Sequence, residues 1–146
     1  MRFEDTIRMM ADDFCNSILQ LGPHNKLGSL RAFPQGACGD VTLLFARYLH
    51  SKGLPTATYV SGERGAWTHA WLEIGDLAID LAADQFPDAP ERLIVARNSS
   101  WHLQFERVRE GPADIECYDK FTRPNLLEAY DQIVSNIPTN REIGST

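Results

Sequence analysis

The pattern of apolar residues changes at Pro55, and this change constrains the fold more than any other feature. Before Pro55, apolar residues recur at three- and four-residue steps, which is typical of amphipathic helices. After it, the chain breaks into short runs rich in β-branched and aromatic residues, which favour strands. Because the helical and strand-like segments are segregated rather than alternating, the sequence predicts an α+β fold.

Glycine and proline mark where the predicted elements end. Helices are expected over residues 4–21, 38–53 and 124–137. Strands are expected over residues 56–60, 67–74, 77–81, 93–96 and 102–108. Residues 23–37 have little periodicity and are expected to form a loop, and the polar tail from Pro138 is expected to fray. The predicted order is two helices, an antiparallel meander and a closing helix.

Length and composition indicate a single globular domain over residues 1–146. Hydrophobic residues make up 43% and charged residues 23%, so a core can form without metals or disulfides. The net charge of -6 disfavours nucleic-acid binding, which needs a basic surface. No apolar run approaches the roughly 18 residues of a membrane span. We therefore expect neither nucleic-acid nor membrane partners, and the oligomeric state is left open.

The amino-terminal sequence and the cysteine content both favour a cytoplasmic protein. The first residues turn acidic at once and lack the apolar core of a signal peptide. Three cysteines, an odd number without a pairing pattern, indicate reduced thiols. Cys15 lies in the first predicted helix and is interpreted as a small buried hydrophobe. Cys117 has no candidate base near it in the sequence.

Cys38 is the candidate nucleophile, because it lies where a helix is predicted to begin. Backbone N–H groups and the positive end of the helix dipole favour a thiolate at such a position. Asp40, in the first turn of the same helix, opposes that effect. Activation is therefore expected to come mainly from a histidine, and His69 and Asp80 downstream are candidates for a Cys-His-Asp arrangement.

The predicted hairpin brings His69 and Asp80 together. Gly75-Asp76 forms a two-residue loop, so Ile74 pairs with Leu77 and the strands pair antiparallel from there. In this register His69 and Asp80 are diagonal neighbours on one face of the sheet, about 7–8 Å apart at Cα, which is within reach of a hydrogen bond. Asp80 also interrupts an apolar run, and an acid facing a core needs a partner.

Structural explanations exist for each residue taken alone. A cysteine before a helix is often structural, and a histidine in a strand is often a satisfied or solvent-facing side chain. His24, His50 and His102 show no ligand spacing with one another or with the cysteines, so no metal site is expected. No cofactor is expected either.

Several fragments together resemble the core of the transglutaminase-like superfamily, which has the papain-like cysteine-enzyme fold. They are Gly-Ala-Cys-Gly-Asp at 36–40, a helix ending near Gly53, Tyr-Val-Ser-Gly at 59–62, His-Ala-Trp-Leu-Glu at 69–73 and Ile-Asp at 79–80. The resemblance covers residues 33–86 and rests on the joint order and spacing of the fragments. It implies Cys38 as nucleophile, His69 as general base and acid, and Asp80 as the orienting acid.

The sequence departs from the superfamily pattern around the acid, where Asp80 is followed by Leu-Ala-Ala-Asp rather than by an aromatic residue and Pro-Thr. Asp84 is therefore a second candidate for the third member of the triad. Gln35 is a candidate oxyanion donor beside the backbone N–H of Cys38. Trp67 and Trp71 bracket His69 and either pack in the core or wall a substrate groove.

The resulting hypothesis is a cysteine-dependent acyl-transfer enzyme that hydrolyses an amide or peptide bond in a peptide or protein substrate. Hydrolysis is preferred over crosslinking because of the small size of the chain, an argument by family analogy. Leader peptidases of lasso peptides and arylamine N-acetyltransferases have related Cys-His-Asp arrangements, so transfer to an amine acceptor is an alternative. A non-catalytic binding module on the same fold is the second alternative.

Overall fold

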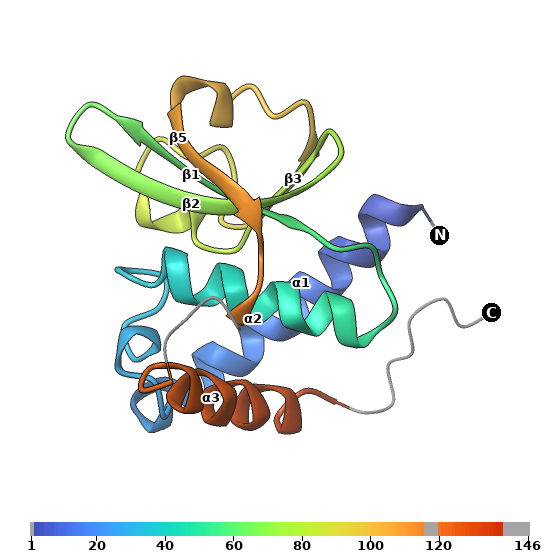
Figure 1. Ribbon diagram of the computed structural model, residues 1–146, viewed down its shortest axis with the longest axis vertical. Coiled ribbons are helices and arrows are strands. Elements are labelled where there is room, and N and C mark those ends of the chain that lie inside the picture. Colours follow the sequence, from blue (N-terminus) through green and yellow to red (C-terminus); the bar gives the residue numbers. More distant parts are fainter. Residues whose placement is uncertain (1, 116–119, 139–146) are drawn as a thin grey trace.

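The computed structural model describes residues 2–115 and 120–138, and it has the expected α+β architecture. The helices are α1 (Phe3–Leu21), α2 (Cys38–Ser51) and α3 (Arg123–Ser135). The strands are β1 (Thr58–Arg64), β2 (Trp67–Ile74), β3 (Leu77–Asp80), β4 (Ile94–Arg97) and β5 (Glu106–Pro112). The helices gather on one side of the sheet, with α2 next to it (Figure 1). Cys117 and the tail from residue 139 lie outside the described residues.

The sheet is antiparallel throughout, in the order β4-β3-β2-β1-β5. The predicted hairpin register is confirmed, with Ile74 opposite Leu77 and Leu72 opposite Ile79. Gly75 has φ +60, a backbone conformation that glycine adopts without strain. The meander covers only the first four strands, because β5 crosses to the far edge and pairs with β1.

The prediction that the first strand ends at Ser61-Gly62 was wrong, because β1 continues to Arg64. The pairing of β1 with β5 shifts register between Ser61 and Gly62, which marks a β-bulge. A Cβ atom on Gly62 would lie 2.9 Å from the carbonyl oxygen of Glu106. Glycine is therefore required by close backbone approach inside a strand, and here it does not signal a turn.

The predicted strand over residues 102–108 was wrong in its first half. Residues His102–Gln104 form a short 3-10 helix, η4, and the strand begins only at Glu106. Trp101, His102 and Phe105 are all buried on the same side of the chain. A strand would send neighbouring side chains to opposite faces, so the helical turn is what buries all three together.

Two hydrophobic clusters lie on opposite sides of the sheet. The larger one joins the three helices to the sheet and includes the packed rings of Phe14, Phe45 and Tyr48. The smaller, which we call the aromatic cluster, consists of Val60, Trp71, Ala78, Ala83, Phe86, Ile94, Trp101 and Phe105. Within the described ranges, no helix has the length and apolar character needed to cross a membrane.

Candidate active site

His69 and Asp80 form a buried hydrogen bond next to the aromatic cluster. The Nε2 atom of His69 lies 2.7 Å from Oδ2 of Asp80, and both side chains are inaccessible to solvent. The other carboxylate oxygen, Oδ1, accepts a hydrogen bond from the backbone N–H of Ala82 at 3.0 Å. Burial raises the pKa of Asp80, but hydrogen bonds with His102 and His69 and the attraction of both rings outweigh it, so the net pKa lies below the ordinary value.

Cys38 is the first residue of α2, and this turn of the helix packs against β2 beside His69. The hydroxyl of Thr42 donates to the carbonyl of Cys38 and lies 3.5 Å from the carbonyl oxygen of Ala70, so one side chain ties the helix to the strand. Burial raises the pKa of the Cys38 thiol. Hydrogen bonds from His69, Gln85 and the backbone of Ala70, together with the attraction of the His69 ring, outweigh this effect and bring the net pKa below the ordinary value.

The imidazole of His69 is placed between an acid and a thiol. Burial lowers the pKa of His69, but hydrogen bonds and attraction from Asp80 and Cys38 raise it to about 9. Nε2 faces Asp80, so Cys38 is met from the Nδ1 side of the ring, where the amide of Gln85 also lies. A lowered pKa at the thiol and a raised pKa at the imidazole both shift the proton toward His69, which favours a thiolate–imidazolium pair.

Gln85 is a member of the site that the sequence analysis missed. Its Nε2 lies 3.0 Å from Nδ1 of His69, and its side chain also hydrogen-bonds Cys38. The residue ends a short 3-10 helix, η3 (Ala83–Gln85), that follows Asp80 after a few residues. The amide therefore contacts both the Cys38 thiol and the imidazole of His69, and no local sequence pattern points to it.

His102 is the second residue that was missed. Its Nε2 lies 2.7 Å from Oδ2 of Asp80, the same oxygen that His69 contacts, and the ring is almost fully buried. The sequence predicts no role for His102, because this residue has no metal-ligand spacing with the cysteines or the other histidines. Its partner lies 22 positions away in the sequence, so only the tertiary fold brings the two side chains together.

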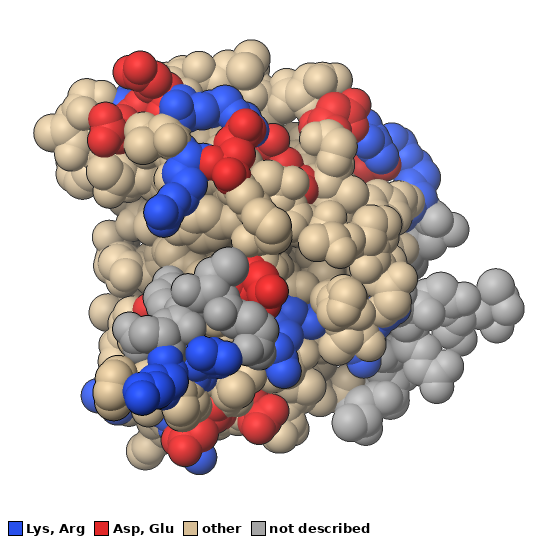
Figure 2. All heavy atoms as spheres, in the orientation of Figure 1, with Lys and Arg blue, Asp and Glu red and all other residues tan. Residues whose placement is uncertain are grey.

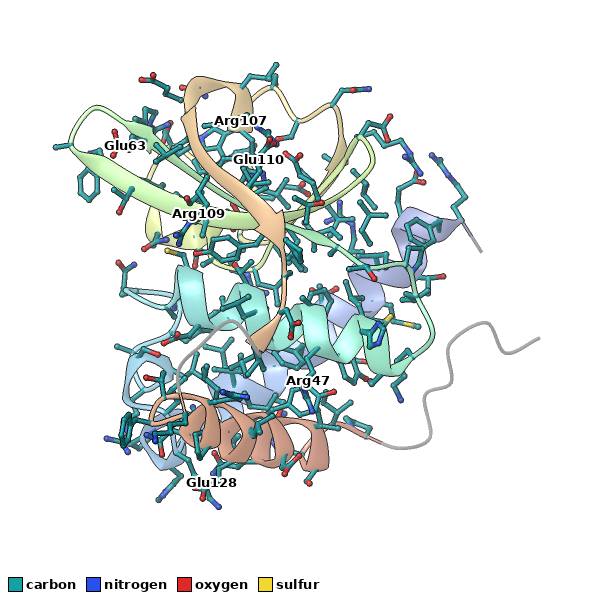
Figure 3. All side chains as sticks on the ribbon, viewed as in Figure 1. Arg47, Glu63, Arg107, Arg109, Glu110 and Glu128 are labelled. Carbon is teal, nitrogen blue, oxygen red and sulfur yellow. The ribbon has the colours of Figure 1, made fainter. Side chains whose placement is uncertain are left out.

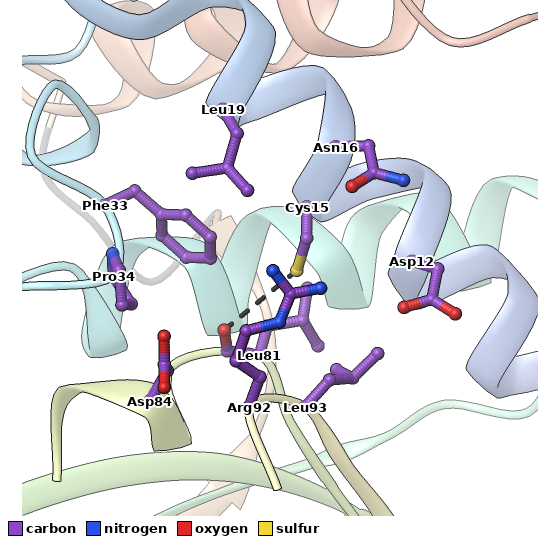
Figure 4. Close-up of a pocket in the computed structure, with 10 residues that line it drawn as sticks. All are labelled: Asp12, Cys15, Asn16, Leu19, Phe33, Pro34, Leu81, Asp84, Arg92 and Leu93. Atoms are coloured by element: carbon purple, nitrogen blue, oxygen red, sulfur yellow. Dashed lines mark hydrogen bonds between the residues drawn. The ribbon is translucent and has the colours of Figure 1, made fainter. Parts of the chain in front are cut away.

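Asp84 and Gln35, the two alternative candidates, do not reach the thiol–imidazole pair. Asp84 is exposed and lines a small cavity of about 100 Å³ beside Cys15, separate from Asp80 (Figure 4). Gln35 is exposed as well, and its backbone N–H donates to the carbonyl of Ala32 at 3.0 Å. The carboxylate that hydrogen-bonds His69 is that of Asp80, and the glutamine that contacts Cys38 is Gln85.

The two tryptophans that bracket His69 differ in their surroundings. Trp71 is fully buried, and its Nε1 donates to Glu73 at 3.0 Å, so it cannot wall a surface groove as had been considered. Trp67 is 62% exposed, and its ring meets Phe86 edge-on with centroids 5.9 Å apart. Both residues lie on the same face of β2, where Trp71 is covered by His102 and Phe105, whereas Trp67 is the first residue of the strand and stays at the surface.

Aromatic rings exclude water from the imidazole of His69. Phe86 meets it edge-on with centroids 4.8 Å apart, and Phe105 and Trp101 lie at 5.7 and 6.0 Å. The guanidinium of Arg64 lies over the same three aromatic rings and forms a bidentate ion pair with Asp88. Such a dry environment strengthens the electrostatic interactions between the buried groups.

His69, Asp80 and His102 also form a cluster of potential metal ligands, with ligand atoms within 4.8 Å of one another. Each of these atoms is already engaged, because both Nε2 atoms lie 2.7 Å from the same carboxylate oxygen. An ion bound there would have to break both hydrogen bonds. The donor set thus matches a hydrogen-bonded network better than a metal centre.

A cavity of about 390 Å³ opens beside the first turns of α2. It is lined by Leu43, Tyr59, Arg109, Glu110, Gly111, Pro112 and Asp114. A Cβ atom on Gly39, the residue after Cys38, would lie 3.5 Å from the hydroxyl oxygen of Tyr59, so the cavity borders the helix end that carries the thiol. On this face the surface is hollowed between the strands and the helices (Figure 2), and Figure 3 places Arg109 above the start of α2.

Comparison with protein-family models, curated proteins and solved structures gives no match for this chain.

Proposed function

We propose that this protein is a cysteine hydrolase that cleaves an amide or peptide bond with Cys38, His69 and Asp80. The observation that carries the proposal is the buried Asp80–His69 hydrogen bond of 2.7 Å, on a ring whose other side meets the Cys38 thiol. An acid that orients a base, beside a nucleophile of lowered pKa, is the arrangement that covalent acyl transfer requires. The transglutaminase-like fold assignment belongs to the same proposal.

In the acylation step, the Cys38 thiolate attacks the carbonyl carbon and forms a carbon–sulfur bond. The negative charge that develops on the carbonyl oxygen is stabilised by N–H donors. The amide of Gln85, which hydrogen-bonds the thiol, and the backbone N–H of Cys38, which has no acceptor within its own helix, supply them. When the carbon–nitrogen bond breaks, His69 gives its Nδ1 proton to the leaving amine, and a thioester remains on Cys38.

In the deacylation step, neutral His69 accepts a proton from water at Nδ1 as the water oxygen attacks the thioester. The carbon–sulfur bond breaks, the carboxylic acid leaves and the sulfur regains its starting state. Throughout both steps, Asp80 accepts a hydrogen bond from Nε2–H of His69 without taking the proton, and it stabilises the imidazolium form. Each step thus uses one ring nitrogen for chemistry and the other for orientation.

The cavity beside Gly39 is the proposed binding site for the substrate. Its volume of about 390 Å³ suits a few residues of a peptide or a small acyl group. Leu43 of α2 forms one wall of the cavity, and Tyr59 of β1 and residues 109–112 of β5 form the other. A substrate lying there would present its carbonyl at the start of the helix.

The test uses p-nitrophenyl acetate as a generic acyl donor. We expect a burst of about one nitrophenolate per protein molecule and an added acetyl mass on the peptide that carries Cys38. Added methylamine separates the two acyl acceptors, because a hydrolase releases acetate and a transferase releases N-methylacetamide. Cleavage of a mixed peptide pool, followed by mass spectrometry, then tests amide hydrolysis.

Two matched variants control this experiment. Cys38→Ala is expected to abolish the burst, and Cys15→Ala is expected to retain it. A burst that survives in Cys38→Ala, or acetyl groups spread over lysines and other cysteines without preference for Cys38, contradicts the proposal. In that case a non-catalytic binding module becomes the better hypothesis for this protein.

A further inference from the structure

The carboxylate of Asp80 is shared by two imidazoles. His69 and His102 each place Nε2 2.7 Å from the same oxygen, Oδ2, and the two rings are nearly parallel, with an interplanar angle of 14°. The proposed reaction uses only one of the two rings. The second is too deeply buried to be an incidental surface contact, since His102 is 5% exposed and Asp80 is fully buried.

Asp80 and Ser99 together set which nitrogen of His102 carries the proton, because an ionised carboxylate only accepts at Nε2 and the Ser99 hydroxyl can donate to Nδ1. The backbone N–H of His102 donates to Oγ of Ser99 at 3.4 Å, and the same hydroxyl lies 2.6 Å from Nδ1 of His102. A hydroxyl that donates to Nδ1 leaves the ring proton on Nε2, where it points at Asp80. Packing holds the ring in this orientation, because the centroids of Trp71 and Trp101 lie 4.7 and 4.9 Å from it.

We infer that His102 is a positioning residue that acts through Asp80: its Nε2–H pins the carboxylate so that Oδ2 stays directed at Nε2 of His69. This inference rests on the proposed function. Oδ1 is held by the N–H of Ala82, and Oδ2 would have a single donor without His102. A buried carboxylate that loses a donor rotates more freely and binds a proton more readily, and either change weakens its hold on the imidazolium of His69.

His102 also lines a cavity of about 430 Å³ together with Ser99, Asn98 and Arg107. This cavity shares no lining residue with the cavity beside Gly39. Small molecules can therefore approach the His102 side of the network without entering the proposed substrate site. Added imidazole is a usable probe for a variant that lacks the ring.

The experiment compares His102→Leu, which fills the space but removes the donor, with His102→Gln, whose amide can donate to Asp80. The readout is the rate at which iodoacetamide alkylates Cys38, followed between pH 5 and pH 9 on the intact chain. In His102→Leu we expect the midpoint of this profile to move up by about one pH unit, which is a tenfold loss of rate on its acid side. In His102→Gln we expect the alkylation rate of Cys38 to stay within about threefold of that of the natural protein. In His102→Ala, which lacks the ring, we expect added imidazole to restore much of this rate.

A folded His102→Leu protein with the natural alkylation profile overturns the inference. If that variant does not fold, the ¹⁵N spectrum of the natural protein decides instead. We expect both rings to carry hydrogen on Nε2 and the Nδ1 of His102 to be unprotonated, whereas a proton on that Nδ1 with a bare Nε2 overturns the inference. Neither the alkylation profile nor the ¹⁵N spectrum requires turnover. If both give the expected result but p-nitrophenyl acetate gives no burst, the proposed function is refuted, whereas the role of His102 at Asp80 is still supported.

Discussion

Cys38 and Cys15 are both partly buried thiols on helices, yet they have opposite acid strengths. Burial raises the pKa of Cys15 to about 12; the charges of Asp12 and, to a lesser extent, Asp80 add to this rise, and Arg92 opposes it. Its sulfur contacts the carbonyl oxygen of Leu81 at 4.0 Å (Figure 4). A carbonyl is an acceptor and favours the protonated thiol.

Cys38 is subject to the same burial effect, which again is the largest contribution to its pKa. The difference lies in its neighbours, because His69, Gln85 and the N–H of Ala70 are donors to the sulfur. Donors stabilise a thiolate, and the imidazole adds positive charge. Exposure therefore does not distinguish the two cysteines, and the hydrogen-bonding groups around each sulfur do.

The largest expected effect is the difference in alkylation between the two thiols. At pH 6 we expect iodoacetamide to label Cys38 at least about 10³-fold faster than Cys15, since a thiol of pKa about 12 has almost no thiolate there. Because the pKa of Cys38 is lowered, its labelling should already be fast below pH 8.5, where an ordinary thiol begins to react. Mass spectrometry of peptides separates Cys15, Cys38 and Cys117. Equal labelling of Cys15 and Cys38 that begins only above pH 8 would refute the distinction.

Replacing His69 is expected to make Cys38 resemble Cys15. In His69→Gln the amide can still donate to Asp80, but the charge beside the thiol is gone and burial then raises its pKa. We expect alkylation of Cys38 at pH 6 to fall about 10²-fold, with Cys15 unchanged. His50→Gln, an exposed histidine at the end of α2, is the matched control and should leave both rates unchanged. An unaltered Cys38 rate in His69→Gln would assign the lowered pKa to the helix end instead.

The two glutamines give a third, smaller contrast. Gln85→Ala removes an amide that contacts both the thiol and Nδ1 of His69, and we expect acetyl transfer from p-nitrophenyl acetate to slow by about 10- to 10²-fold. Gln35→Ala changes an exposed side chain and is expected to have no effect. The rate of the nitrophenolate burst is measured for both variants. The reverse order would restore Gln35 as the oxyanion donor.

The parts of this site that depend on local pattern could be predicted from the sequence. The two-residue turn at Gly75-Asp76 fixes the pairing of β2 with β3, and that pairing alone places His69 and Asp80 on one face. The start of α2 at Cys38 follows equally from the spacing of apolar residues and the flanking glycines.

Gln85 and His102 could not be predicted in this way, because both are delivered by single 3-10 turns between strands. A short turn has no periodicity from which the direction of a side chain can be inferred. The bulge at Gly62 and the burial of Phe105 arise in the same part of the fold, where β5 crosses to pair with β1. Tertiary contacts decide these features, and the sequence near each residue does not.

The smallest expected effect concerns stability, and it reverses the ranking of the two cysteines. Cys15→Ala removes a sulfur that packs among Leu19, Phe33 and Leu93, and we expect a loss of about 1 kcal/mol in the free energy of unfolding. Cys38→Ala removes a group at the end of a helix and is expected to cost less than about 0.5 kcal/mol. Urea unfolding of both variants at one pH measures the difference. If Cys38→Ala were the more destabilised protein, the thiol would serve mainly to hold α2 against β2, and its reactivity would be a by-product of that packing.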